Sequence, residues 1–267
     1  MLRALLLAPL FCGCLAYIPA YPSNSTDDGN HRVSLNATVN DPTVHLQWYT
    51  NGSFITTVSY ALAGNSSRGV NQVKPHIPSF LTHSNHLVWF FQGALVHFSE
   101  DFVNNTTNST NTPWIALVPC DQNATNASQD LDIFTLARDK GAVAVLLYAL
   151  YSSNCILNPG YNHTAPPLDI FTSPSLTTSR LIEYQFGQLG NVSVANYDPS
   201  HLDEGTSIVN SFIQDGSKTA PGYLFATLNA SNAATAHETT TPAEGADGKS
   251  TGSGLGRSRG ALATIVT

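Results

Sequence analysis

The stretch DLDIFTLARDKGAVAVLLYAL, from Asp130 to Leu150, decides the fold class of this chain. Between residues 132 and 140 the apolar side chains fall on one face at helical spacing, which predicts a short amphipathic helix. Asp130 or Asp132 is placed to cap its start, and Gly141 stands where a left-handed C-cap is wanted. The run AVAVLLY that follows, at 142–148, is continuously apolar and indicates a strand covered on both faces.

A second run of the same kind, WIALV at 114–118, precedes the helix. Two strands of this type form a parallel pair only when a crossover joins them, and the helix before Gly141 supplies that crossover. The order strand, helix, strand therefore predicts a right-handed βαβ unit in an α/β or α+β domain.

Further strands are predicted from runs of β-branched and aromatic residues. TVHLQWYT at 43–50 and FITTVSYALA at 54–63 are separated by Asn-Gly-Ser, which predicts a hairpin. One or two strands are expected at 86–97, where Gly93 is a possible bulge or turn. Two more are expected late in the chain, at 192–197 and at 222–228, and the last of these could close the sheet.

The intervening segments give weaker predictions. Residues 99–113 are polar and contain three glycosylation motifs, so an exposed loop is expected there. Residues 169–185 predict a short strand followed by a helix that is capped by Thr177 or Thr178.

The N-terminus, residues 1–16, has the pattern of a secretory signal peptide. Arg3 precedes an apolar run at 4–15, and Cys14-Leu15-Ala16 is a small-x-small site for cleavage before Tyr17. Ala20 is a second possible cleavage point. The apolar run is shorter than the about 20 residues that a spanning helix needs, so no stable membrane span is expected after cleavage. An N-terminal anchor that stays uncleaved is the alternative.

Asn-x-Ser/Thr motifs are dense along the chain and predict a glycoprotein of the secretory pathway. The acceptor asparagines are Asn24, Asn36, Asn51, Asn65, Asn104, Asn105, Asn108, Asn123, Asn126, Asn162, Asn191 and Asn229. Cleavage of the signal removes Cys12 and Cys14 and leaves one pair, Cys120 and Cys155, which predicts a disulfide in an oxidising compartment. The formal net charge of −7 argues against a nucleic-acid partner.

These residues resemble the protease-associated (PA) domain family. The resemblance rests on WIALVPC, the amphipathic helix ending in Lys-Gly-Ala, the strand AVAVLLY and the proline-containing DIFTSPSLTTSRLIE. It implies a β-sandwich or open barrel flanked by short helices, best matched over about 80–197 within a domain at 17–229. The family's usual RG-x-C-x-F after the first strand is replaced by VPCDQNATNAS, which keeps only the cysteine.

The arrangement also resembles the lumenal part of PA-transmembrane-RING proteins. No span or zinc-binding Cys/His segment follows the domain, so ubiquitin-ligase activity is not implied. Residues 230–267, rich in Ala, Thr, Gly and Ser, are expected to be a disordered tail.

A search for chemistry gives no catalytic, cofactor or metal residues. His83-x-x-His86 is interpreted as a pair of loop histidines, and Glu100-Asp101 and Asp203-Glu204 as solvated loop acids. The expected function is a non-catalytic, secreted or lumenal module that binds a protein or peptide. Two alternatives stay open, a secreted hydrolase with a dispersed Ser, His and Asp set and the ectodomain of a truncated PA-transmembrane-RING ligase.

Overall fold

The computed structural model describes residues 16–25, 43–50, 54–65, 88–100, 103–121, 128–158, 161, 167–190, 194–215 and 220–231. All of them belong to one unit of the chain, Met1–Ala234. The predicted signal sequence before residue 16, the tail beyond 231, and the histidines at 83 and 86 lie outside the described residues.

The predicted βαβ unit is confirmed. Strands β7 (Trp114–Pro119) and β9 (Ala142–Tyr148) pair in parallel, and helix α2 (Ile133–Asp139) lies between them in the chain, preceded by the short strand β8 (Ser128–Asp132). Of the two candidate caps it is Asp132 that accepts hydrogen bonds from the first turn of α2, from the N–H groups of Phe134 and Thr135. Gly141 has φ 96°, and a Cβ there would lie 2.2 Å from the Thr110 carbonyl oxygen, so only glycine fits.

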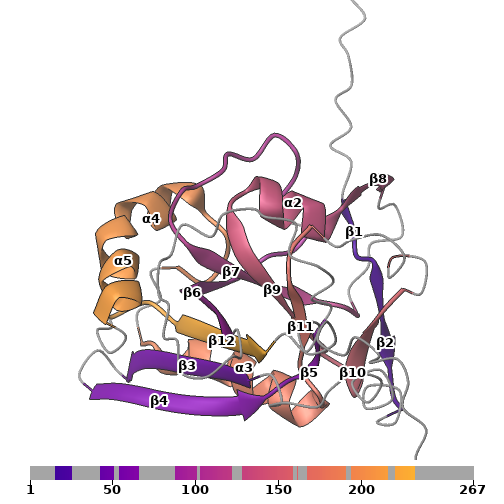
Figure 1. The fold of residues 1–267 in the computed structure, drawn as a ribbon, viewed down its shortest axis with the longest axis horizontal. Helices are drawn as coiled ribbons and strands as arrows, with labels where there is room; N and C mark the ends of the chain where they lie inside the picture. Colours follow the sequence, from indigo (N-terminus) through magenta and orange to yellow (C-terminus); the bar gives the residue numbers. More distant parts are fainter. Residues whose placement is uncertain are drawn as a thin grey trace, which may run out of the picture. The chain divides into compact units, whose positions relative to one another are not determined.

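The main sheet has eight strands in the order β4-β3-β12-β6-β7-β9-β11-β5. Its centre is parallel and consists of β6 (Val88–His97), β7, β9 and β11 (Ile170–Thr172). Antiparallel strands flank it: β12 (Phe225–Ser231), β3 (Thr43–Thr50) and β4 (Phe54–Ala61) on one side, and β5 (Ala63–Asn65) on the other. The fold is therefore mixed α and β, as the sequence predicted (Figure 1).

The sheet curls toward closure. Strands β4 and β5 occupy its opposite edges, yet only Leu62 separates them in the chain. Two strands joined by one residue can lie at opposite edges only if the sheet curls until those edges approach each other. This curling gives the expected open barrel.

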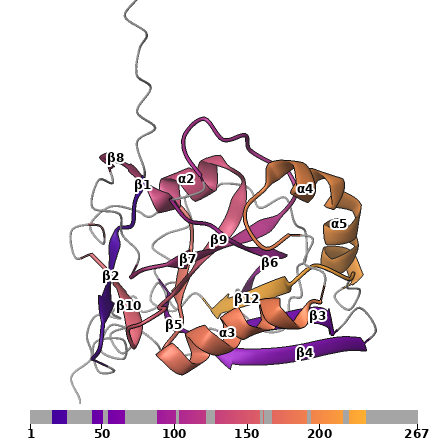
Figure 2. The same cartoon turned by 180° about the vertical axis from the view of Figure 1, so that it is seen from behind.

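Both faces of the parallel strands are buried, as their uninterrupted apolar runs predicted. Alternate residues such as Ile115 and Leu117 pack with Ile182 and Phe186 of α3 (Leu176–Gln188). Their neighbours in the strand, including Ala116, pack in a second core, to which α2, α4 (Pro199–Glu204) and α5 (Thr206–Asp215) contribute. Seen from behind, α3 lies across the sheet from α2 (Figure 2).

Several local predictions were wrong. Ser175, whose hydroxyl accepts from the Thr178 N–H, caps α3 in place of Thr177 or Thr178. Residues 194–197 form no strand and give only an isolated bridge from His97 to Asn196. Helices α4 and α5 were not predicted, because only Leu202 of α4 and two residues of α5 are buried, which leaves little apolar periodicity to detect.

Other differences concern position. β12 does not close the sheet at an edge but lies between β3 and β6, and it continues to Ser231, past the expected boundary at 229. The predicted exposed loop at 99–113 is partly buried, since Thr110 and Thr112 are 5% and 1% exposed. Among the described residues, no helix is long and apolar enough to cross a membrane.

Candidate functional site

The predicted disulfide forms at the carboxyl end of the parallel strands. Cys120 directly follows β7, and Cys155 lies in the short strand β10 (Asn154–Leu157), which follows the loop after β9. The two Cα atoms are 5.8 Å apart, and both side chains are buried. β10 pairs in turn with β2 (Ala20–Ser23), so the bridge connects the main sheet to the N-terminal strands.

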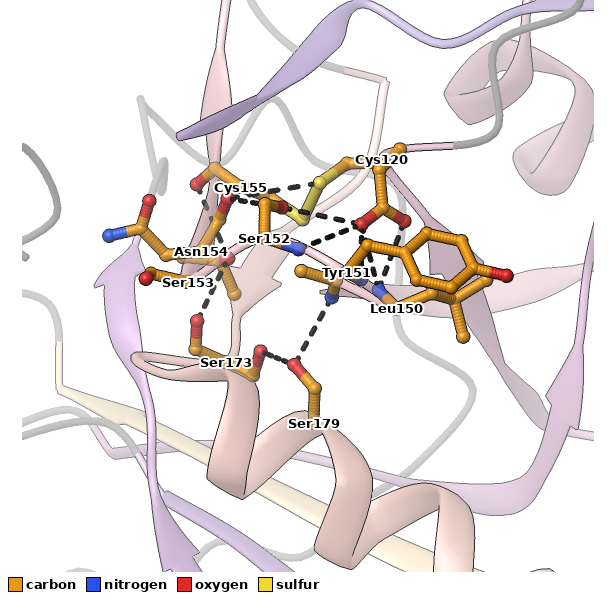
Figure 3. The surroundings of a disulfide bond; sticks show 12 residues. Cys120, Leu150, Tyr151, Ser152, Ser153, Asn154, Cys155, Ser173 and Ser179 are labelled. Atoms are coloured by element: carbon orange, nitrogen blue, oxygen red, sulfur yellow. Dashed lines mark hydrogen bonds between the residues drawn. A yellow bond between two sulfur atoms is a disulfide. The ribbon is translucent and has the colours of Figure 1, made fainter. Parts of the chain in front are cut away.

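The loop between β9 and β10 is held by the carboxylate of Asp121, the residue after the bridged cysteine. That carboxylate accepts the backbone N–H groups of Leu150 at 2.9 Å, Tyr151 at 2.7 Å and Ser152 at 3.2 Å. It also accepts the Ser152 hydroxyl at 3.3 Å. Figure 3 shows these donors converging on the one acidic group beside the disulfide. Three consecutive amides aimed at one anion fix the backbone of this turn.

Two further supports hold the same loop. The N–H of Ala149 donates to the Ser179 hydroxyl at 3.1 Å, and Ser179 is itself 2.5 Å from the Ser173 hydroxyl in a buried pair. On the other side, the Asn154 amide donates to the Ser25 carbonyl at 3.1 Å. The loop is thus tied to α3, to β7 and to the N-terminal segment, while the Tyr151 side chain remains 74% exposed.

A charged cluster lies at the same end of the sheet. His97, the last residue of β6, places Nδ1 2.9 Å from the Ala195 carbonyl oxygen and Nε2 2.8 Å from a carboxylate oxygen of Glu183 on α3. The Ala195 carbonyl oxygen can only accept, so Nδ1 carries a hydrogen and donates to it, while Nε2 pairs with the Glu183 carboxyl group. The His97 ring packs against the Phe186 ring, with 4.2 Å between the two ring centroids.

Tyr148 connects this cluster to the loop. Burial raises the pKa of the Tyr148 hydroxyl well above its usual value, and the negative charges of Glu183 and Asp121, with a hydrogen bond to Glu183, raise it further. The phenol therefore stays protonated. It is the last residue of β9, so the ends of β6, β7 and β9 bring together His97, Asp121 and Tyr148.

This arrangement is poorly suited to nucleophilic catalysis. Both nitrogens of His97 are engaged, Cys120 is oxidised, and Ser173 and Ser179 are buried against each other. Elsewhere in the described part of the chain, His45 lies 2.7 Å from the Ser59 hydroxyl, but the pair spans the neighbouring strands β3 and β4. A cross-strand polar pair on a sheet surface accounts for it.

The other acids take different positions from the predicted ones. Glu100 is 1% exposed, so it is not a solvated loop acid, and Asp101 lies outside the described residues. Asp203 and Glu204 are exposed, as predicted, but they lie on α4 and not in a loop, and Asp203 accepts the Thr110 hydroxyl. Within the described ranges, no group of three or more His, Cys, Asp or Glu residues could hold a metal ion.

The sequon segment before β7 is held by a buried lysine. The Lys140 ammonium donates to the Asn105 carbonyl at 3.0 Å and to the Thr107 carbonyl. The Lys140 carbonyl oxygen accepts from the Trp114 indole at 3.3 Å and the Tyr197 hydroxyl at 3.1 Å. Lys140 is 7% exposed, so its charge is largely removed from water and depends on these partners.

The structure describes six of the acceptor asparagines. Asn24, Asn105 and Asn108 are exposed, Asn104 and Asn229 are half-buried, and Asn65 lies in β5. Asn36, Asn51, Asn123, Asn126, Asn162 and Asn191 lie outside the described residues. Glycosylation of any of them stays a prediction.

Sequence reasoning missed Asp121, His97, Glu183 and Tyr148 as members of one site. A usable signal was present: three of the four stand at or just after the ends of parallel strands, where the sites of α/β proteins gather. The chain matches no family model, and no characterised protein is similar enough to show a family.

Proposed function

We propose that this chain is a non-catalytic interaction module of the protease-associated type, which binds a protein or peptide in the secretory lumen or outside the cell. The observation that carries the proposal is the loop at 149–153, a well-anchored backbone that presents an exposed aromatic side chain, Tyr151. Exposed aromatic residues on preordered loops are typical binding anchors, because little conformational entropy is lost when a partner binds.

Three features of the chain support this proposal, one each for its fold, its compartment and its non-catalytic role. The βαβ unit, the curled sheet and the short flanking helices are those that the resemblance implies. The bridge from Cys120 to Cys155 and the density of sequons support an oxidising, glycosylating compartment. Both ring nitrogens of His97 are engaged with Ala195 and Glu183, which supports binding over acid–base catalysis.

The test is proximity cross-linking from the loop. A photoreactive phenylalanine analogue replaces Tyr151 in the secreted, glycosylated protein, and a second sample carries it at Tyr184, which is 62% exposed on α3. We expect a discrete set of cross-linked proteins from position 151 that is missing from position 184. Unlabelled wild-type protein should compete for those partners, whereas Tyr151→Ala should not. Identical products from both positions, or equal competition by Tyr151→Ala, would contradict the proposal.

A further inference from the structure

Within the described residues, the edge strand β4 lacks the charges, prolines and bulges that usually keep a sheet edge unpaired. Its sequence FITTVSYA contains no charged residue and no proline, and β-branched residues occupy positions 55–58. Edge strands are normally protected by charges, prolines, bulges or short length, because an open row of backbone N–H and C=O groups recruits another strand. Within the described residues, β4 pairs with β3 alone.

The pairing of β4 with β3 keeps this edge regular. Eight consecutive residue pairs, from Thr43 with Ala61 to Thr50 with Phe54, run without a register shift. β4 lies at the outer margin of the ribbon in both views (Figures 1 and 2). Its outward row, Ile55, Thr57, Ser59 and Ala61, is exposed, with Ile55 at 51%. The opposite row turns toward α3, where the Gln185 amide donates to the Tyr60 hydroxyl at 2.9 Å.

Other edges in the described part of the molecule do carry protection. β5, at the far edge of the main sheet, is three residues long. β2 contains Pro22, which cannot donate to another strand. β4 therefore differs from these two in being long, neutral and regular at once.

We propose that β4 is a self-association surface, at which a second copy of this chain adds its own β4 in antiparallel orientation. A two-fold axis makes the surface pair with itself, so a strand of equal length and the same alternation is always supplied. Residues directly opposite in an antiparallel pair point to the same face, so the exposed row meets the exposed row. Thr57 then faces either Thr57 or Ser59 of the second copy, and both pairings are neutral and polar.

Charge favours this occupant over a charged peptide. The chain has a formal net charge of −7, yet β4 itself is uncharged, so contact at the edge brings no like charges together. Repulsion between two such chains acts at longer range and is screened by salt. Self-association through β4 should therefore strengthen as salt is added, whereas a complex formed by attraction of opposite charges would weaken.

The test is sedimentation velocity of the secreted protein over a concentration series, at about 0.05 M and about 0.5 M NaCl, where the screening length falls roughly threefold. We expect a monomer–dimer equilibrium that shifts toward dimer at the higher salt. Thr57→Lys places like charges near the two-fold axis and should raise the dissociation constant about tenfold or more. The matched control is Thr177→Lys, which changes an exposed threonine on α3 and should leave the equilibrium unchanged.

Two further measurements place the contact. Amide hydrogen exchange across 54–61 should slow as concentration rises, and Ile55→Lys should abolish that slowing while leaving the circular dichroism spectrum unchanged. A protein that stays monomeric throughout, or a dimer that neither lysine on β4 weakens, would overturn the proposal. The loop at 149–153 takes no part in the β4 contact, so the self-association result and the Tyr151 cross-linking result are independent.

Discussion

Two loops at opposite ends of the parallel strands are held by side chains of opposite charge. At the carboxyl end, the Asp121 carboxylate collects the N–H groups of the loop after β9. At the amino end, the Lys140 ammonium collects carbonyl groups of the sequon segment before β7. A turn whose amides converge needs an anion and a turn whose carbonyls converge needs a cation, so the backbone direction decides which residue fits each position.

The two loops also present different groups. The segment held by Lys140 carries the sequons at Asn104, Asn105 and Asn108, whereas the loop held by Asp121 presents Tyr151. If both assignments hold, the three sequons of the Lys140 segment lie at one end of the strands and the partner binds at the other. Among the described sequons, Asn24 differs, because its side-chain oxygen accepts the Ser153 N–H at 3.3 Å and its sequon therefore adjoins the binding loop.

The largest expected effect comes from removing the disulfide beside the Asp121 loop. The Lys140 segment at the amino end has no such bridge among the described residues. Replacing Cys120 and Cys155 by serine opens a loop with a sequence separation of 35 residues. Chain-entropy reasoning gives a loss of about 3 to 4 kcal/mol in the free energy of unfolding. Urea denaturation of the secreted variant measures it, and non-reducing peptide mapping of wild type should find no free thiol at either position. An unchanged midpoint would mean that Asp121 and the strand pairing hold the loop unaided.

The second test removes the anion and keeps its shape. Asp121→Asn leaves one carbonyl oxygen to serve three converging N–H groups and replaces charged acceptors with a neutral one, so we expect a loss on the order of 2 kcal/mol. Hydrogen exchange should speed up at residues 150–152. The matched control is Asp139→Asn, whose carboxylate meets only the neighbouring Arg138 at an exposed position and should contribute little. Equal losses of stability in the two variants would show that the Asp121 carboxylate does not specifically stabilise the loop.

The third test makes the corresponding change at the amino end. Lys140→Met keeps the length of the buried stem and deletes the ammonium, which leaves the Asn105 and Thr107 carbonyls without this donor. We expect a loss of about 1 to 2 kcal/mol and faster exchange confined to residues 103–112. Arg138→Met, at an exposed position two residues earlier, is the control. Faster exchange at 150–152 instead would show that the two loops are coupled through the strands.

Sequence alone predicted what is local. The βαβ unit, an aspartate cap at Asp130 or Asp132 and the left-handed Gly141 were predicted from patterns within residues 114–148. The structure has all three, with Asp132 as the cap. The disulfide followed by counting, because two cysteines remain after the signal is removed. The position of β12 between β3 and β6 leaves no comparable trace, since pairing between distant segments has no local pattern.

The site was predictable only in part for the same reason. In the sequence, Asp121 looks like an ordinary loop residue and Lys140 like the basic end of a helix, and their roles depend on which backbone groups the fold brings to them. Helix α4 reads as PSHLDE, too polar and too short to register as a helix, although Asp198 caps it and Pro199 begins it. Sequence thus placed the scaffold, and tertiary contacts determined which polar side chains are engaged.

The smallest predicted effect concerns a half-buried acid at the amino end of the strands. Asp169 precedes β11, and its backbone carbonyl accepts the Val145 N–H. Burial raises the pKa of the Asp169 carboxyl above its ordinary 3.8. A raised pKa means that the folded state holds the proton longer than the unfolded state. This residue's contribution to stability is therefore full at pH values below the unfolded pKa and is lost as the pH rises through the folded pKa.

Asp169→Asn tests that sign, because the amide is neutral at every pH. Urea denaturation at about pH 4 and about pH 7 should show the variant gaining stability relative to wild type as the pH rises. Asp139→Asn, at an exposed position, should show no such trend. The opposite trend, with wild type gaining toward pH 7, would show that the Asp169 carboxylate has a favourable ionic partner. The amino end would then hold an anion as well as a cation, and the contrast between the two ends of the strands would be weaker than the hydrogen bonds of Lys140 and Asp121 indicate.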